Sequence, residues 1–127
     1  MNLEKVVFGF FIILAMTLNF GFVLGAVDDP RQHHVYELFA AIVVNLVATV
    51  LKFGDRTQMG AVLLATSLVA DLELLAAALV WTFAVHVQGT GVTPEVMGTI
   101  ISLAGGALVA NIISVILLVI EISAQRR

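Results

Sequence analysis

Four long apolar stretches dominate this chain and restrict its possible folds more than any other feature. The first runs from Val6 to Val27 without a charged residue, and the stretch between Glu95 and Glu121 is also uncharged. About 20 consecutive apolar residues form a helix long enough to cross the hydrocarbon core of a bilayer. The sequence therefore predicts an all-α integral membrane four-helix bundle, with helices at about residues 6–27, 35–53, 57–87 and 95–121.

The composition excludes several classes of protein. Of the 127 residues, 61% are hydrophobic and 12% are charged, and the mean hydropathy is +1.09. A water-soluble fold could not bury so much apolar surface, so we expect one transmembrane domain over residues 1–127 in a lipid bilayer. The absence of cysteine excludes disulfides and thiolate metal sites, and the net charge of -3 argues against nucleic acid as a partner. We expect no cofactor.

The basic residues predict the orientation of the helices. Only Arg31 lies on one side of a four-span arrangement, and the other five lie on the opposite side, namely Lys5, Lys52, Arg56, Arg126 and Arg127. Cytoplasmic segments of membrane proteins carry an excess of Lys and Arg. Both termini, and the turn near Gly54, are therefore predicted to be cytoplasmic.

Two acids in the third helix carry the strongest functional signal. Asp71 and Glu73 lie near the middle of the span, where each acid costs about 2.5–3.5 kcal/mol of insertion free energy. The two positions are roughly 200° apart around a helix, so the carboxylates are predicted to point to opposite faces. This arrangement suggests one protein surface inside the subunit and a second at the axis of a homo-oligomer.

Polar residues on the other helices predict a place where a cation could bind. Asn19, Asn45 and Asn111 contribute one amide from each remaining helix, and further hydroxyls come from Ser67, Thr66, Thr17, Thr49 and Ser114. Carboxylate, amide and hydroxyl oxygens are hard ligands that suit monovalent or divalent cations of groups 1 and 2. The alternative is that these groups only form hydrogen bonds between helices. The sequence leaves the identity of any metal unknown.

Small residues form two predicted seams where helices could approach closely. One seam, on the fourth helix, contains Gly98, Ser102, Gly106 and Ala110, and the other, on the first helix, contains Gly21 and Gly25. Small residues at this spacing let two backbones come together in a membrane. Both packing within one subunit and contact in a homo-oligomer are consistent with the pattern.

The sequence also resembles a known family. The run Phe53-Gly54-Asp55-Arg56-Thr57-Gln58, followed by Leu68-Val69-Ala70-Asp71-Leu72, is similar to small four-helix bacterial inner-membrane proteins of uncharacterised function. The resemblance implies a bacterial inner membrane and transfers no active site. The chain departs from small multidrug exporters, because its first helix has no membrane glutamate, and from fluoride channels, because their phenylalanine-threonine signature is absent.

Three functions fit these features. The first is a homo-oligomeric cation channel in which Asp71 or Glu73 forms an acidic ring. The second is a proton- or cation-coupled exporter of small molecules, in which one acid alternates between a proton and the substrate. The third is a non-transporting accessory subunit of a larger ion transporter. No enzyme is expected, because the chain has no catalytic triad spacing, phosphate loop or metalloprotease motif.

Overall fold

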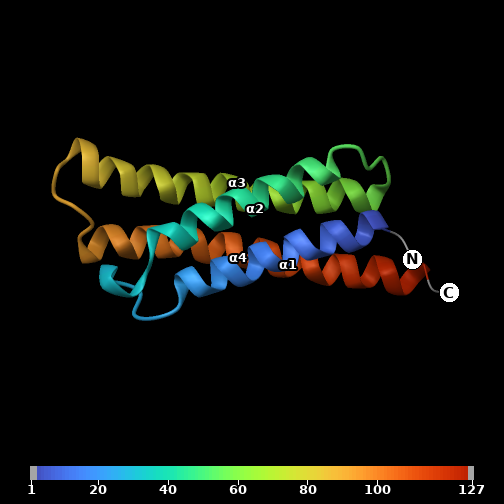
Figure 1. Cartoon of the computed structure of the whole chain (residues 1–127), viewed down its shortest axis with the longest axis horizontal. Helices are drawn as coiled ribbons and strands as arrows, with labels where there is room; N and C mark the ends of the chain where they lie inside the picture. The colour runs from blue at the N-terminus through green and yellow to red at the C-terminus, as the bar shows by residue number, and fades with distance from the viewer. Residues whose placement is uncertain (1–2, 126–127) are drawn as a thin grey trace.

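The computed structural model describes residues 3–125, in which the chain forms four long helices and no strand. They are α1 (Leu3–Val23), α2 (Val35–Lys52), α3 (Gln58–Thr82) and α4 (Pro94–Gln125), and they run antiparallel along one axis (Figure 1). A 3-10 turn, η1 (Pro30–Gln32), precedes α2, and a π-helical turn, η2 (Phe83–Val87), extends α3. Each span is long and apolar enough to cross a membrane. The prediction of an all-α, four-helix, multi-pass membrane protein is confirmed at this level.

The helices form a closed ring of neighbours. α1 packs against α2 and α4, and α3 packs against the same two helices. The start of α1, the end of α4 and the α2–α3 turn lie at one end of the bundle, which we call the terminal end (Figure 1). The other two connections lie at the opposite end, which we call the loop end.

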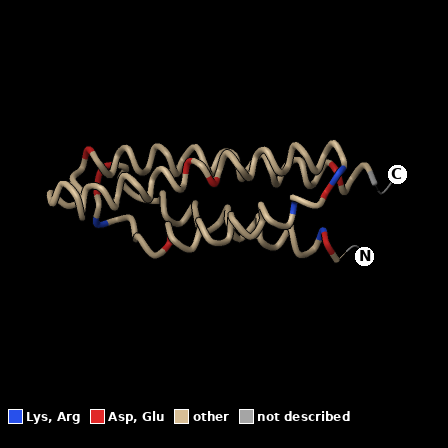
Figure 2. Tube along the Cα trace, turned by 90° about the horizontal axis from the view of Figure 1, so that it is seen from above, with Lys and Arg blue, Asp and Glu red and all other residues tan. Residues whose placement is uncertain are grey.

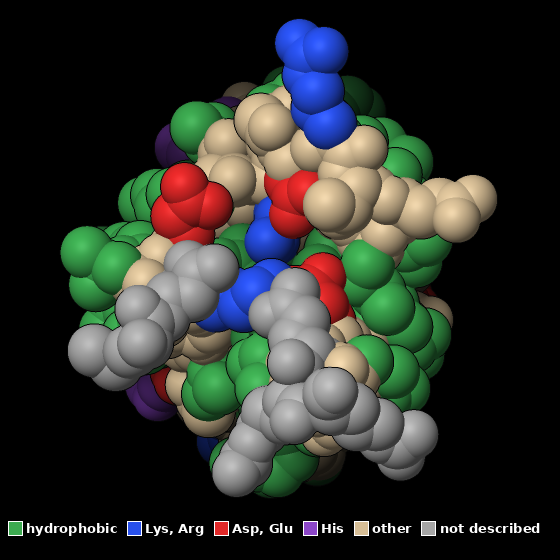
Figure 3. All heavy atoms as spheres, turned by 90° about the vertical axis from the view of Figure 1, so that its right-hand side faces the viewer, with side chains coloured by type: hydrophobic (Ala, Val, Ile, Leu, Met, Phe, Trp, Pro, Cys, Tyr) green, Lys and Arg blue, Asp and Glu red, His purple; other side chains and the backbone are tan. Residues whose placement is uncertain are grey.

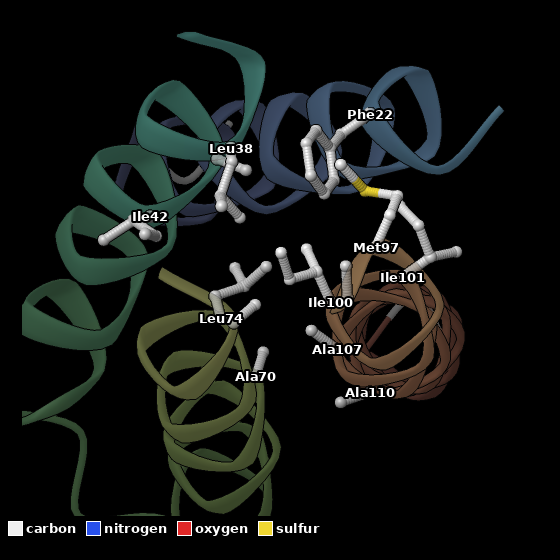
Figure 4. Close-up of a cluster of buried hydrophobic side chains, with 13 residues drawn as sticks. Phe22, Leu38, Ile42, Ala70, Leu74, Met97, Ile100, Ile101, Ala107 and Ala110 are labelled. Carbon is white, nitrogen blue, oxygen red and sulfur yellow. The ribbon is translucent and has the colours of Figure 1, made fainter. Parts of the chain in front are cut away.

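Two hydrophobic clusters fill the bundle. The loop-end cluster includes Phe22, Leu38, Leu74 and Met97, which point toward one another from all four helices (Figure 4). A smaller terminal-end cluster consists of Phe8, Ile12, Ala48, Leu63 and Leu118. Large apolar side chains also cover the outside, where a bilayer would solvate them.

The first helix ends at Val23, before the predicted end at Val27. The loop that follows folds back onto it: the ring nitrogens of buried His33 lie 2.6 and 2.7 Å from the carbonyl oxygens of Phe22 and Ala26. The Phe22 carbonyl, which the last helical turn leaves free, thereby lies within hydrogen-bond distance of a side chain, while the Ala26 carbonyl belongs to the loop and also accepts from the Asp29 amide. Gly25, at φ 101°, lies beyond the helix, so the seam predicted for the first helix does not include it.

Charged residues lie mainly toward the two ends of the bundle (Figure 2). At the terminal end, shown in Figure 3, an ion pair between Lys5 and Glu121 joins α1 to α4. Lys52 Nζ lies 3.4 Å from Asp55 Oδ2 and 4.3 Å from the centroid of the Phe8 ring. A cavity of about 730 Å³ opens here, and Lys5, Phe8, Lys52 and Asp55 contribute to its lining.

The α2–α3 turn is held by side-chain caps. Thr57 Oγ1 accepts a hydrogen bond from the Gly60 amide at 2.9 Å and is the N-cap of α3. Asp55 accepts from the Thr57 hydroxyl at 2.7 Å and from the Thr57 amide at 2.9 Å. These bonds, led by the hydroxyl and supported by Lys52, lower the pKa of the Asp55 carboxyl below its usual 3.8.

Candidate functional site

A layer of buried polar side chains separates the two hydrophobic clusters. Along α2, Asn45 lies between Ile42 of the loop-end cluster and Ala48 of the terminal-end cluster. The same order recurs on the other three helices, where Asn19, Ser67 and Asn111 lie between members of the two clusters. With the neighbouring Thr49 and Asp71, these four residues form what we call the central polar layer: Asn19, Asn45, Thr49, Ser67, Asp71 and Asn111.

Asp71 is joined to α2 inside this layer. It is 7% exposed, and Thr49 Oγ1 lies 2.5 Å from its Oδ2 atom. The same hydroxyl lies 2.9 Å from the carbonyl oxygen of Asn45. A hydroxyl carries one proton, so Thr49 can donate to only one of these two oxygens at a time. The Asp71 carboxylate and the Asn45 carbonyl therefore compete for the single Thr49 proton.

Backbone carbonyls determine the orientation of two amides. Asn19 Nδ2 donates to the Ala104 carbonyl of α4 at 3.0 Å, and Asn45 Nδ2 donates to the Ala41 carbonyl at 3.1 Å. Turning either amide around would place an oxygen against a carbonyl oxygen, which is repulsive. Each Oδ1 atom is consequently directed away from the one hydrogen bond that its side chain makes among the described residues.

Six buried side-chain atoms have no hydrogen-bond partner among the described residues, and oxygens predominate. The single nitrogen is Asn111 Nδ2, and the five oxygens are Asn19 Oδ1, Asn45 Oδ1, Ser67 Oγ, Asp71 Oδ1 and Asn111 Oδ1. Buried polar atoms in proteins are normally partnered, because an unsatisfied one costs free energy. Unpartnered oxygens therefore outnumber unpartnered nitrogens in this layer by five to one. That chemistry suits a cation.

The α3–α4 contact beside the layer is fully bonded. Thr66 Oγ1 and Ser114 Oγ lie 2.5 Å apart, and Thr66 also donates to the Leu63 carbonyl at 2.9 Å. These hydroxyls hold α3 and α4 together, with Ser114 donating to Thr66 and Thr66 donating to the Leu63 carbonyl. Thr17 is exposed and bonds only to the Leu14 carbonyl, so it lies outside the layer.

Glu73 lies outside the layer. Its half-buried carboxylate contacts Gly106 on α4, at the place that a Cβ atom on Gly106 would occupy. Asp71 thus faces α2 while Glu73 faces α4. One chain therefore supplies a helix of its own beside each carboxylate. The homo-oligomer itself stays a prediction.

The predicted seam on α4 has unequal surroundings along its length. Gly98 has open space where a Cβ would lie, and Ser102 is exposed. Gly106 accommodates Glu73, and Ala110 is buried in the loop-end cluster. On α1, Gly21 leaves room for the Glu37 carboxylate of α2, with an oxygen 2.6 Å from where a Cβ would lie.

Thr49 has a role that composition alone does not reveal, because it supplies the one hydrogen bond found for Asp71. Its spacing of four from Asn45 places both on one helix face, and that spacing is a signal available in the sequence.

No group of three or more His, Cys, Asp or Glu among the described residues could hold a metal ion. Any cation in the layer would depend on one carboxylate and neutral oxygens.

Four membrane-length helices around a buried polar layer define the class: a small multi-pass membrane protein. The chain belongs to a family of unknown function, DUF6394, which it matches over residues 32–122. The matched region holds five of the six layer residues and excludes Asn19. Searches of curated proteins and of solved structures found no match. The resemblance to a small four-helix family without an assigned function is confirmed.

Proposed function

We propose that this protein moves a small cation across a membrane, with Asp71 as the central binding group. One observation carries the proposal: the central polar layer holds a buried carboxylate, and five of its side-chain oxygens, including Asp71 Oδ1, have no hydrogen-bond partner among the described residues. A carboxylate in a low-dielectric interior needs a compensating positive charge. The basic side chains near the bundle interior are already paired, Lys5 with Glu121 and Lys52 with Asp55. A mobile cation would supply the missing charge.

The surroundings of the layer support a carrier rather than an open pore. Apolar side chains close it on both sides, with Phe22 and Leu74 toward the loop end and Phe8 and Leu63 toward the terminal end. A cation held there is occluded, so transport requires one cluster to loosen while the other stays packed. The cavity at the terminal end would provide access from that side. This arrangement predicts saturable flux.

The same proposal includes an orientation. Lys5 in α1, and Lys52 and Arg56 at the α2–α3 turn, belong to the terminal end, while Arg31 in η1 belongs to the loop end. Arg126 and Arg127, which were counted in the sequence-based prediction, lie outside the described residues. We propose a bacterial inner membrane with both termini in the cytoplasm, supported by the excess of basic residues at the terminal end. The open surface at Gly98 and Ser102 is the place where a second copy would pack.

The experiment is cation flux into proteoliposomes that contain the purified protein. Parent protein is compared with Asp71→Asn and with Glu73→Gln, which is a matched change in the same helix outside the layer. We expect flux to be lost in Asp71→Asn and retained in Glu73→Gln. Equal flux in all three proteins would contradict the role of Asp71. No flux of any cation through correctly folded protein would contradict the function.

A further inference from the structure

We infer that the central polar layer selects a monovalent metal cation that has shed its water, an inference that rests on the proposed function. The argument begins with the charge of the layer. Asp71 is its only ionisable side chain, and the other five members are amides and hydroxyls. An ionised Asp71 gives the layer one negative charge, which a monovalent cation neutralises.

The other acids cannot add to this charge. Glu73 is directed toward Gly106 of α4, and Glu121 and Asp55 at the terminal end are each paired with a lysine. A divalent cation beside Asp71 would therefore keep an uncompensated positive charge inside the bundle. In a low-dielectric interior an unpaired charge is strongly disfavoured. Binding of Ca²⁺ or Mg²⁺ at this layer is therefore disfavoured.

The neutral oxygens are suited to replace a hydration shell. Ser67 lies one helical turn from Asp71, and Asn45 lies one turn from Thr49, so the four share the interface between α2 and α3. Asn111 on α4 contributes an amide whose two polar atoms have no hydrogen-bond partner among the described residues. Carboxylate, amide and hydroxyl oxygens are ligands that hard metal cations accept in place of water.

A proton on Asp71, in place of a metal cation, would leave most of these oxygens without a bonding partner. One proton on Asp71 can join at most two oxygens, whereas five in this layer have no donor among the described residues. A metal cation can be coordinated by several oxygens at once. Thr49 acts here as a positioning residue, because its contact with Oδ2 leaves Oδ1 of Asp71 free for the ion.

The test measures cation binding to purified protein in detergent, with choline replacing other cations at constant ionic strength. Trp81 is the only tryptophan and packs in the loop-end region near Phe22, so its fluorescence can follow both binding and thermal unfolding. We expect Na⁺ or K⁺ to raise the Tm of the parent and of Glu73→Gln. Ca²⁺ and Mg²⁺ should bind at least about tenfold more weakly, and Asp71→Asn should respond to none of them.

A second variant tests the charge argument in the other direction. Asn111→Asp introduces a second carboxylate into the layer and should shift preference toward Ca²⁺ by about tenfold or more. In the parent, binding of Ca²⁺ or Mg²⁺ as tight as that of Na⁺ and K⁺ would overturn the inference. A response to pH alone, without a response to any metal ion, would also overturn it.

These outcomes are separable from failure of the proposed function. Proteoliposome flux that is carried equally by Ca²⁺ and Na⁺ would support translocation and overturn the monovalent selectivity. Selective monovalent binding without flux of any ion would leave the site intact and overturn translocation. If Asn111→Asp fails to fold, the comparison of ions on the parent protein still decides the inference.

Discussion

Replacing Asn111 with leucine should make the protein more stable in the absence of a cation. The side chain is fully buried, and neither its Oδ1 nor its Nδ2 atom has a partner among the described residues. Each unsatisfied buried atom costs about 1–3 kcal/mol, so removing two of them offers a gain of about 2–6 kcal/mol. Leucine has a similar volume and a higher helix propensity. We expect the free energy of unfolding of Asn111→Leu to rise by at least about 2 kcal/mol.

The assay is unfolding in detergent with increasing dodecyl sulfate, first with choline and then with Na⁺. A cation at 100 times its Kd stabilises the folded parent by about 2.7 kcal/mol, and the variant should lose most of this effect. Thr17→Val removes an exposed hydroxyl on α1 and is the control, with an expected change within about 0.5 kcal/mol. A variant less stable than the parent in choline, or equally stabilised by Na⁺, would refute the reasoning.

Three further predictions concern the contacts that hold the helices together. Gly98→Ala faces open space and should gain up to about 1 kcal/mol from helix propensity, whereas Gly106→Ala must displace the flexible end of Glu73 and should gain less; equal melting curves would contradict this. A double-mutant cycle on Lys5 and Glu121 should give a coupling free energy of about 1–3 kcal/mol, because the pair is largely buried, and additive effects would contradict it. Because the folded-state pKa of Asp55 is lowered, its contribution to stability is present above about pH 3.8 and is lost as the pH falls through the lower folded value. Amide protection factors in the α2–α3 turn, which correct for the intrinsic pH dependence of exchange, should accordingly fall only below that pH, and a fall at higher pH would contradict the assignment.

The helices themselves could be predicted because length and hydropathy decide membrane spans. Their ends could not be predicted equally well. The end of α1 at Val23 depends on His33, which returns from the next segment to bind the carbonyls of Phe22 and Ala26. Such a tertiary contact leaves no periodic signal in the sequence. The cap at Thr57, by contrast, follows from local chemistry that the sequence displays.

The candidate site could likewise be predicted only in part from the sequence. Helical periodicity predicted that Asp71 and Glu73 point to different surfaces, and the structure places them against α2 and α4. Periodicity could not identify those surfaces, because it does not specify which helices are neighbours. The direction of the free amide oxygens depends on carbonyls such as that of Ala104, which is far away along the chain. The excess of acceptors therefore became apparent only in three dimensions.

The most direct measurement is the number of monovalent cations bound per chain at equilibrium, using radioactive sodium or rubidium and purified protein. The central polar layer has one carboxylate and free oxygens from several helices, so saturation should occur at one cation per chain. Asp71→Asn should bind none, while Glu73→Gln should bind as the parent does. Absence of bound cation in the parent, or unchanged binding in Asp71→Asn, would contradict the assignment of the layer as a cation site.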